Sequence, residues 1–116
     1  MTKIEAVVRP GKLEDVKNAV GKLGIFGMTV TQVIGCGSQK GRTEVYRGAE
    51  YSINLLPKVK VEIVVDDKDV DKVVEAITQS ARTGEIGDGK IFVYKIDNAV
   101  RIRTGESGDA AIAKKA

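Results

Sequence analysis

The sequence predicts a single α+β domain, and three observations support this. The chain has 116 residues, which is the usual size of one domain. Its apolar residues recur with a period of two in some segments and at helical spacing in others. The order strand, helix, strand occurs twice along the chain. We therefore expect a ferredoxin-like βαββαβ sandwich with an antiparallel sheet, both helices on one face, and a long loop between the second and third strands.

The first half of the chain contains a strand, a helix and a second strand. The apolar Ile4, Ala6 and Val8 alternate with the charged residues Lys3, Glu5 and Arg9, which predicts the first strand. Pro10 and Gly11 end it. Four apolar residues then recur at the spacing of one helix face: Leu13, Val16, Val20 and Leu23. Residues 28–34 alternate and are rich in β-branched side chains, so they predict the second strand.

The second half of the chain repeats this order. Pro57 precedes an apolar strand at residues 59–65, and Asp66 or Asp67 caps the helix that follows. The buried face of that helix is predicted to consist of Val70, Val73, Val74, Ile77 and Ala81. Residues 91–96 are apolar again and predict the last strand of the sheet.

The C-terminal end is predicted as a strand-like segment followed by a tail. Val100 and Ile102 alternate with Arg101 and Arg103, so the two arginines are expected to share one face. Two guanidinium groups on one face could clamp a polyphosphate, and a solvated strand face is the alternative. Residues 105–116 are small and polar and predict a mobile tail.

Composition excludes several classes of function. Because the chain has no histidine, it cannot contain a Ser-His-Asp or Cys-His nucleophile or a histidine metal site. The single Cys36 excludes an internal disulfide and a cysteine-based zinc site. No apolar run approaches the ~20 residues of a membrane span, and the N-terminus lacks a signal-peptide core, so we expect a cytoplasmic protein. The net charge of +3 permits an anionic ligand without demanding nucleic acid.

Residues 83–92 combine three glycines and a lysine in a pattern that favours phosphate binding. Glycine adopts positive φ without strain, so successive N–H groups can turn toward one anion, and Lys90 adds positive charge. Gly84, Gly89 and Lys90 have the spacing of a P-loop, but Ile91 stands where a P-loop has the Ser or Thr that binds Mg²⁺. The segment also follows a helix and opens a strand, the reverse of a P-loop. We interpret it as a phosphate-binding loop of another kind.

Residues 35–56 lack a clear period, which is unusual over so long a stretch of a small domain. Such a loop is usually functional or disordered. Tyr46 and Tyr51 lie in it, and tyrosines in a charged, glycine-rich segment are typical of exposed interaction or modification sites.

Two long motifs in register resemble the signatures of the PII nitrogen-regulatory signal-transduction proteins. Residues 46–51 (Tyr-Arg-Gly-Ala-Glu-Tyr) resemble the first signature. Residues 83–92 (Thr-Gly-Glu-Ile-Gly-Asp-Gly-Lys-Ile-Phe) resemble the second. The similarity also covers residues 27–30, 39–41, 57–65 and 100–106 at matching spacing. The resemblance therefore spans nearly the whole chain.

The resemblance implies a homotrimer of ferredoxin-like subunits that catalyses no major reaction itself. Each cleft between subunits would bind ATP or ADP, and with ATP and Mg²⁺ also 2-oxoglutarate. Residues 37–55 would be the family's T-loop, residues 82–90 its B-loop and residues 102–109 its C-loop, with 110–116 as the mobile tail. The implied partners are an ammonium channel, glutamine synthetase or a nitrogen transcription regulator. No nucleic acid is expected, and the membrane would be reached only through a channel.

The nucleotide site implied by matching positions has an adenine pocket and a set of phosphate contacts. The adenine pocket would be lined by Val7, Thr29 and Val64, with Glu62 nearby. The nucleotide would approach closely at Gly35 and Gly37, next to Ser38 and Gln39. The phosphates would be held by Gly87, Asp88, Gly89 and Lys90 and, from across the cleft, by Arg101 and Arg103.

The implied 2-oxoglutarate site lies at the base of the long loop. Gln39 would supply an oxygen to Mg²⁺, a metal that commonly takes few protein ligands. Lys58 would neutralise the distal carboxylate of the keto acid, and backbone donors would come from Lys40, Gly41 and Gly87. Partner binding would fall to Tyr46, Arg47 and Tyr51. Tyr51 also matches the position that some relatives nucleotidylate.

The chain departs from the family pattern at a few positions. Many relatives have Arg in place of Ser38 and Phe in place of Cys36, and Ala49 lacks the hydroxyl that some relatives phosphorylate. Losing a charge-assisted phosphate contact costs about 1.5–3 kcal/mol. We therefore expect a weakened grip on the nucleotide phosphates and altered discrimination between ATP and ADP.

Three alternatives to the metabolite-sensing reading stay open. The first is an adenine-nucleotide sensor that does not respond to 2-oxoglutarate. The second is an RNA-binding ferredoxin-like module, which would need exposed aromatic residues on the central strands of the sheet. The third is a phosphotransfer enzyme, which the missing P-loop hydroxyl and the absent histidine argue against.

Overall fold

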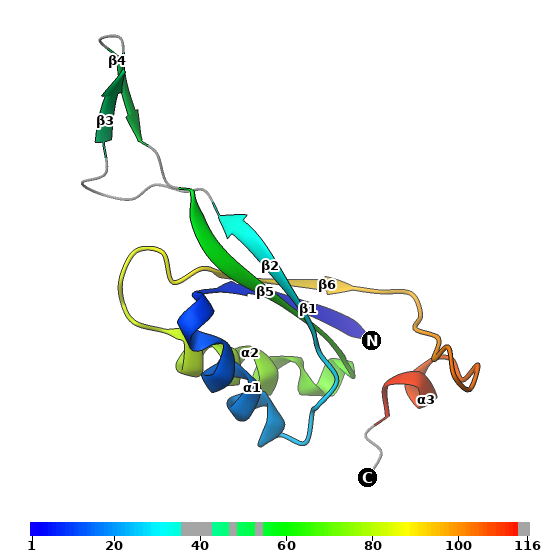
Figure 1. Ribbon diagram of the computed structural model, residues 1–116. Coiled ribbons are helices and arrows are strands. Elements are labelled where there is room, and N and C mark those ends of the chain that lie inside the picture. The colour runs from blue at the N-terminus through cyan, green and yellow to red at the C-terminus, as the bar shows by residue number, and fades with distance from the viewer. Residues whose placement is uncertain (36–42, 47–48, 53–54, 114–116) are drawn as a thin grey trace.

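A four-stranded antiparallel sheet forms the body of the molecule, with α1 and α2 packed on one face (Figure 1). The computed structural model describes residues 1–35, 43–46, 49–52 and 55–113. The strand order within the sheet is β2-β5-β1-β6. These elements are β1 (Thr2–Val8), α1 (Leu13–Gly21), β2 (Thr29–Gly35), β5 (Leu56–Val65), α2 (Val70–Ala81) and β6 (Lys90–Lys95). The predicted ferredoxin-like βαββαβ fold is confirmed.

The period of two in the sequence decides which face of the sheet is covered. In β1 the side chains of Ile4 and Ala6 are fully buried, whereas Glu5 between them is only half-buried. Ile4 pairs with Ile63 of β5 on one side and with Val93 of β6 on the other. Ile4 and Ile63 meet the apolar stripes of the two helices, whereas Val93 on the edge strand is half exposed. The core cluster comprises Ile4, Ala6, Val8, Val16, Val20, Ile25, Val59, Val61, Ile63, Val65, Val73, Ile77 and Ala81.

Both helices that cover the sheet, α1 and α2, begin with a short 3₁₀ turn. Pro10–Lys12 leads into α1, and Asp67–Asp69 leads into α2. The Asp66 carboxylate caps the second turn, because its Oδ1 accepts a hydrogen bond from the Lys68 backbone N–H at 3.2 Å. The cap expected at Asp66 or Asp67 is therefore made by Asp66. Of the expected helix face, Val73, Ile77 and Ala81 are buried, and the other two valines pack partly buried against the core.

Strand β5 begins earlier than the sequence predicts. It starts at Leu56 and contains Pro57, which pairs with Ile34 of β2. On the other side of β5, the last pair with β1 joins Val8 to Val59. Pro57 thus lies beyond the end of β1, at a local edge where a missing N–H is tolerated.

A small hairpin interrupts the segment that lacks a clear period. β3 (Thr43–Tyr46) and β4 (Ala49–Ser52) form a two-stranded sheet apart from the four-stranded one. Tyr46 pairs with Ala49 across a two-residue connection, which is the shortest common hairpin spacing. We did not predict these strands, although that spacing is a recognisable signal.

The strand predicted around Arg101 and Arg103 is wrong. In the described residues Val100 makes a single bridge to Ser107, and the chain then turns. The Gly105 N–H donates to the Arg101 carbonyl at 2.7 Å, and the Arg101 N–H donates to the Glu106 carbonyl at 2.8 Å. Gly105 has a φ of 75°, which favours this turn over an extended strand. The two arginines therefore do not share a strand face.

A helix of four residues, α3 (Asp109–Ile112), stands at the start of the expected tail. The Arg101 guanidinium donates to the carbonyl of Ala111 in this helix at 3.2 Å. That bond ties the turn at 101–105 to α3. Residues 114–116, the last part of the tail, lie outside the described residues.

Candidate functional site

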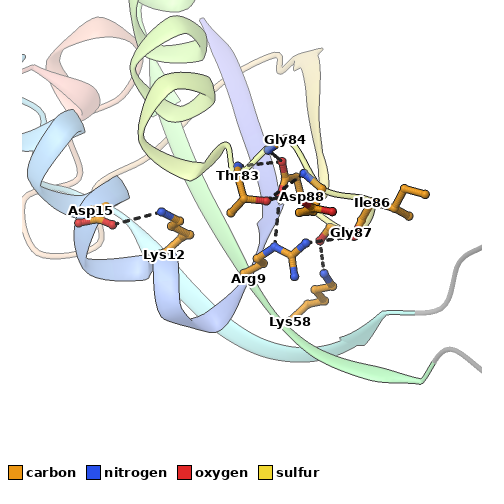
Figure 2. Close-up of polar contacts among 10 residues, drawn as sticks. Arg9, Lys12, Asp15, Lys58, Thr83, Gly84, Ile86, Gly87 and Asp88 are labelled. Carbon is orange, nitrogen blue, oxygen red and sulfur yellow. Dashed lines mark hydrogen bonds and ion pairs between the residues drawn. The ribbon is translucent and has the colours of Figure 1, made fainter. Parts of the chain in front are cut away.

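The glycine loop at residues 82–90 joins α2 to β6 and is organised by one carboxylate (Figure 2). Asp88 Oδ2 accepts hydrogen bonds from the backbone N–H groups of Thr83 and Gly84, each at 2.9 Å. Asp88 Oδ1 accepts from the Thr83 hydroxyl. These donors, Thr83 first, hold the pKa of Asp88 well below its ordinary value. The carboxylate therefore stays ionised and closes the loop on itself.

Glycine is required where this loop meets the sheet. Gly87 and Gly89 have φ values of 102° and 100°, in the left-handed region. A Cβ atom on Gly89 would lie 1.7 Å from the carbonyl oxygen of Val7 in β1. The loop backbone can thus rest directly on the end of β1 only because this position has no side chain.

Two cations converge on the middle of the loop: Arg9, which follows β1, and Lys58 of β5. The Arg9 guanidinium pairs with Asp88 through Nε at 3.1 Å and donates through Nη2 to the Ile86 carbonyl at 3.0 Å. The Lys58 ammonium donates to the Gly87 carbonyl. A Cβ on Gly87 would lie 3.4 Å from Arg9 Nη2 and 3.6 Å from Lys58 Nζ. Two positive groups therefore flank Gly87 against a single carboxylate, Asp88.

Lys58 is the more buried of the two cations, with 9% of its surface exposed. Burial, together with the nearby Arg9 charge, lowers the pKa of the Lys58 ammonium. A nearby anion would compensate the charge of the Lys58 ammonium and stabilise its protonated form. The site is electrostatically suited to a carboxylate or phosphate group.

The other predicted site residues of the sheet lie on the helix-free face. The register pairs Thr29 with Glu62, Val64 with Lys3, and Val7 with Lys90. Glu62 forms ion pairs with Lys3 at 2.5 Å and with Lys60 at 3.6 Å, and Lys3 is the main cause of its lowered pKa. A Cβ on Gly35 would lie 2.9 Å from the Lys58 side chain, so Gly35 abuts Lys58.

The structure brings the predicted nucleotide residues together in two groups. Thr29, Glu62, Val64 and Arg101 line a wide hollow of about 1040 Å³ that also includes part of α3. Val7, Asp88, Gly89 and Lys90 line a smaller groove of about 340 Å³ beside α2. Arg103 is exposed and belongs to neither of these lining sets. The expected adenine residues and phosphate residues of the chain thus border separate hollows, with two exceptions: Val7 lies with the phosphate residues, and Arg101 lies with the adenine residues.

Several predicted residues cannot be placed in this geometry. Gly37, Ser38, Gln39, Lys40, Gly41 and Arg47 lie outside the described residues. Tyr46 ends β3 and Tyr51 lies in β4. The expectations for Mg²⁺ at Gln39 and for partner contacts in this segment therefore stay predictions.

The helix-free face lacks the aromatic platform that RNA-binding sheets of this kind use. On the central strands β1 and β5 the described side chains of this face are aliphatic or charged: Lys3, Glu5, Val7, Lys58, Lys60, Glu62 and Val64. Phe92 and Tyr94 are exposed, but they stand on the edge strand β6. The Tyr94 hydroxyl also donates to Glu5. This arrangement disfavours the RNA-binding alternative.

Sequence reasoning missed two residues of the loop network, Arg9 and Thr83. Thr83 follows a helix and precedes glycine, which is a signal for a side chain that bonds the local backbone. Arg9 stands directly before Pro10, where β1 ends, but nothing local marks its partner, which is 79 residues away. For Asp88, predicted as a phosphate contact, the structure assigns the carboxylate to the loop itself.

The fold and the cation pair define a small α+β domain with a glycine loop flanked by two cations, Arg9 and Lys58. The family model for nitrogen regulatory protein P-II matches residues 1–106. The chain is 59% identical to nitrogen regulatory protein P-II of Pasteurella multocida over 112 residues, 97% of this chain and 100% of the relative. It is 59% identical to P-II 1 of Escherichia coli and 58% identical to P-II of Rhodospirillum rubrum, with the same coverage.

The chain therefore belongs to the P-II family of nitrogen regulatory proteins. This is a signalling family and not a family of enzymes, as the sequence analysis expected. Among the described residues, no helix is long and apolar enough to span a membrane.

Proposed function

We propose that this protein reports nitrogen, carbon and energy status by binding ATP or ADP in the clefts of a homotrimer. The observation that carries the proposal is the convergence of Arg9 and Lys58 on a preformed glycine loop. Such a loop suits phosphate groups, because backbone donors and fixed cations face an anion without reorganising. Family membership supports the same reading.

The contacts of the described residues suggest which groups would meet a nucleotide phosphate. Because the Asp88 carboxylate is held by Thr83, Gly84 and Arg9, a contact from residue 88 would come from its backbone. Lys90 is exposed and forms no ion pair with another described residue, so its charge is available. Arg101 and Arg103 would reach the phosphates of a nucleotide on a neighbouring subunit. Their position in a turn, away from the glycine loop of their own chain, suits that role.

We propose 2-oxoglutarate as a second effector. Its distal carboxylate would pair with Lys58, whose burial near Arg9 favours an added negative charge. Its keto acid end would complete the coordination of a Mg²⁺ ion held by Gln39 and the nucleotide phosphates. An adenine-nucleotide sensor without this response is the alternative, since Ser38 departs from the arginine of many relatives.

The output would pass through the T-loop, residues 37–55, to an ammonium channel, glutamine synthetase or a nitrogen transcription regulator in the cytoplasm. A ligand that binds one conformation of this segment more tightly than another shifts its population, and hence its affinity for a partner. Arg47→Ala would weaken channel binding and leave nucleotide affinity unchanged.

Calorimetric titration of the trimer tests the proposal. ATP and ADP are titrated with and without Mg²⁺ and 2-oxoglutarate, and Lys58→Met is compared with the wild type. We expect the keto acid to tighten ATP binding in the wild type and to have no effect in the variant. Binding of ATP with no response to the keto acid would favour the nucleotide-only sensor. Absence of any nucleotide binding would overturn both.

A further inference from the structure

Arg9 is placed to hold two points of the glycine loop at once. It follows the last residue of β1, and 31% of its side chain is exposed. Its Nε meets the Asp88 carboxylate at 3.1 Å and its Nη2 meets the Ile86 carbonyl at 3.0 Å (Figure 2). The guanidinium therefore connects the end of β1 to a loop almost eighty residues later in the chain.

Asp88 transmits this contact to the beginning of the loop. The oxygen that meets Arg9 Nε also accepts the Thr83 hydroxyl, and the second oxygen accepts the N–H groups of Thr83 and Gly84. The Asp88 carboxylate thus bonds to Arg9 on one side and to Thr83 and Gly84 on the other. A carboxylate that lost Arg9 could rotate, and its two backbone donors would then lose their fixed acceptor.

We propose that Arg9 is a positioning residue of the nucleotide site, which sets the loop from Thr83 to Lys90 through Asp88. This inference rests on the proposed function, because the loop is the expected phosphate site. In this role Arg9 does not touch the nucleotide. It fixes the Asp88 carboxylate, whose oxygens accept hydrogen bonds from the loop backbone.

The two contacts made by residue 9 require an arginine side chain. Nε and Nη2 belong to one rigid plane, so they fix the Asp88 oxygen relative to the Ile86 carbonyl. A lysine offers one point charge on a flexible stem and can satisfy the two acceptors only loosely. Arg9→Lys is therefore expected to give an intermediate phenotype between wild type and Arg9→Ala.

The first test uses the protein without nucleotide. Hydrogen exchange of the Thr83 and Gly84 amides is compared between wild type, Arg9→Ala and the control Lys12→Ala, which removes a neighbouring cation paired with Asp15 at 3.9 Å. We expect exchange about tenfold faster in Arg9→Ala only, as for loss of one charge-assisted hydrogen bond. Unchanged exchange in Arg9→Ala would overturn the proposal.

The second test separates positioning from direct contact. Affinities for ADP and for adenosine, which has no phosphate, are measured in Arg9→Ala, Asp88→Ala and the double variant. We expect each single variant to weaken ADP binding about tenfold and to leave adenosine binding unchanged. In the double variant the losses should not add, because Arg9 acts through Asp88.

Additive losses for ADP would mean that Arg9 touches the ligand itself and would overturn the positioning role. An equal loss for adenosine would mean general damage to the fold and would also count against it. If the wild type binds no ADP, the proposed function fails, and the exchange experiment still decides whether Arg9 sets the loop.

Discussion

The core between sheet and helices and the glycine loop at 82–90 are stabilised by different forces. The core consists of interlocking aliphatic side chains, and Ile4, Val16 and Ile77 are almost completely buried. The loop is held by the Asp88 carboxylate and by the cations Arg9 and Lys58, and it contains three glycines of positive φ. The core is therefore sensitive to volume, whereas the loop is sensitive to charge and to backbone conformation. A variant can damage either region with little effect on the other.

The largest expected effect falls on the core. Ile63→Ala removes a fully buried side chain that pairs with β1, so it should lower the free energy of unfolding by about 2–5 kcal/mol. Urea denaturation measures this loss. Nucleotide affinity under conditions where the variant is folded should be unchanged, and a parallel loss of affinity would show that the two regions are coupled.

Gly89→Ala tests the junction of the two regions. The new methyl group would meet the Val7 carbonyl in a backbone conformation with φ near 100°, so we expect a loss of about 1–3 kcal/mol. Gly84→Ala is the matched control, because its φ is 90° and a Cβ there meets no atom within 4 Å. Equal stability losses in both variants would mean that backbone strain alone, and not the contact with β1, decides.

Comparison with an Asp88 variant isolates the response of the loop to acid. The pKa of Asp88 is far lower in the folded state than its ordinary 3.8, so its contribution is complete above 3.8 and is lost as the pH falls below that value. Between pH 5 and pH 2.5 the wild type should therefore lose more stability than Asp88→Ala. Denaturation curves at both pH values give the comparison, and parallel losses in the two proteins would contradict it.

The smallest effect concerns Lys58 at high pH. Its pKa is lowered in the folded state, so the unfolded chain binds more protons between that value and 10.5. The stability of the wild type relative to Lys58→Met should consequently rise as the pH approaches 10.5. A relative stability that falls over this interval would mean that Lys58 prefers its charged form in the folded protein.

The sequence predicts the body of the fold well because periodicity reports burial. The alternation in residues 4–8 and the helical stripe from Leu13 to Leu23 correspond to β1 and α1. The segment at 100–103 alternates as well, but hydrogen bonds around Gly105 turn it. Among the described residues, its strand-like pairing is limited to the bridge between Val100 and Ser107. Alternation alone cannot distinguish these two cases.

The candidate site is predictable only in part. The glycines and Lys90 mark a phosphate loop by their local pattern, and the resemblance adds Lys58. The partnership of Arg9 with Asp88 depends on the tertiary fold, which brings the end of β1 beside a loop that follows α2. No local rule contains that information.

The closed ring of bonds around Asp88 has a kinetic consequence for a sensor. A loop that is ordered during folding needs no slow rearrangement before a nucleotide enters, so association can proceed at the rate of a rigid site. Exchange of one nucleotide for another is then limited by how quickly the first departs. If the loop is the nucleotide site proposed above, the ring formed by Thr83, Gly84 and Arg9 around one carboxylate would keep the association step fast.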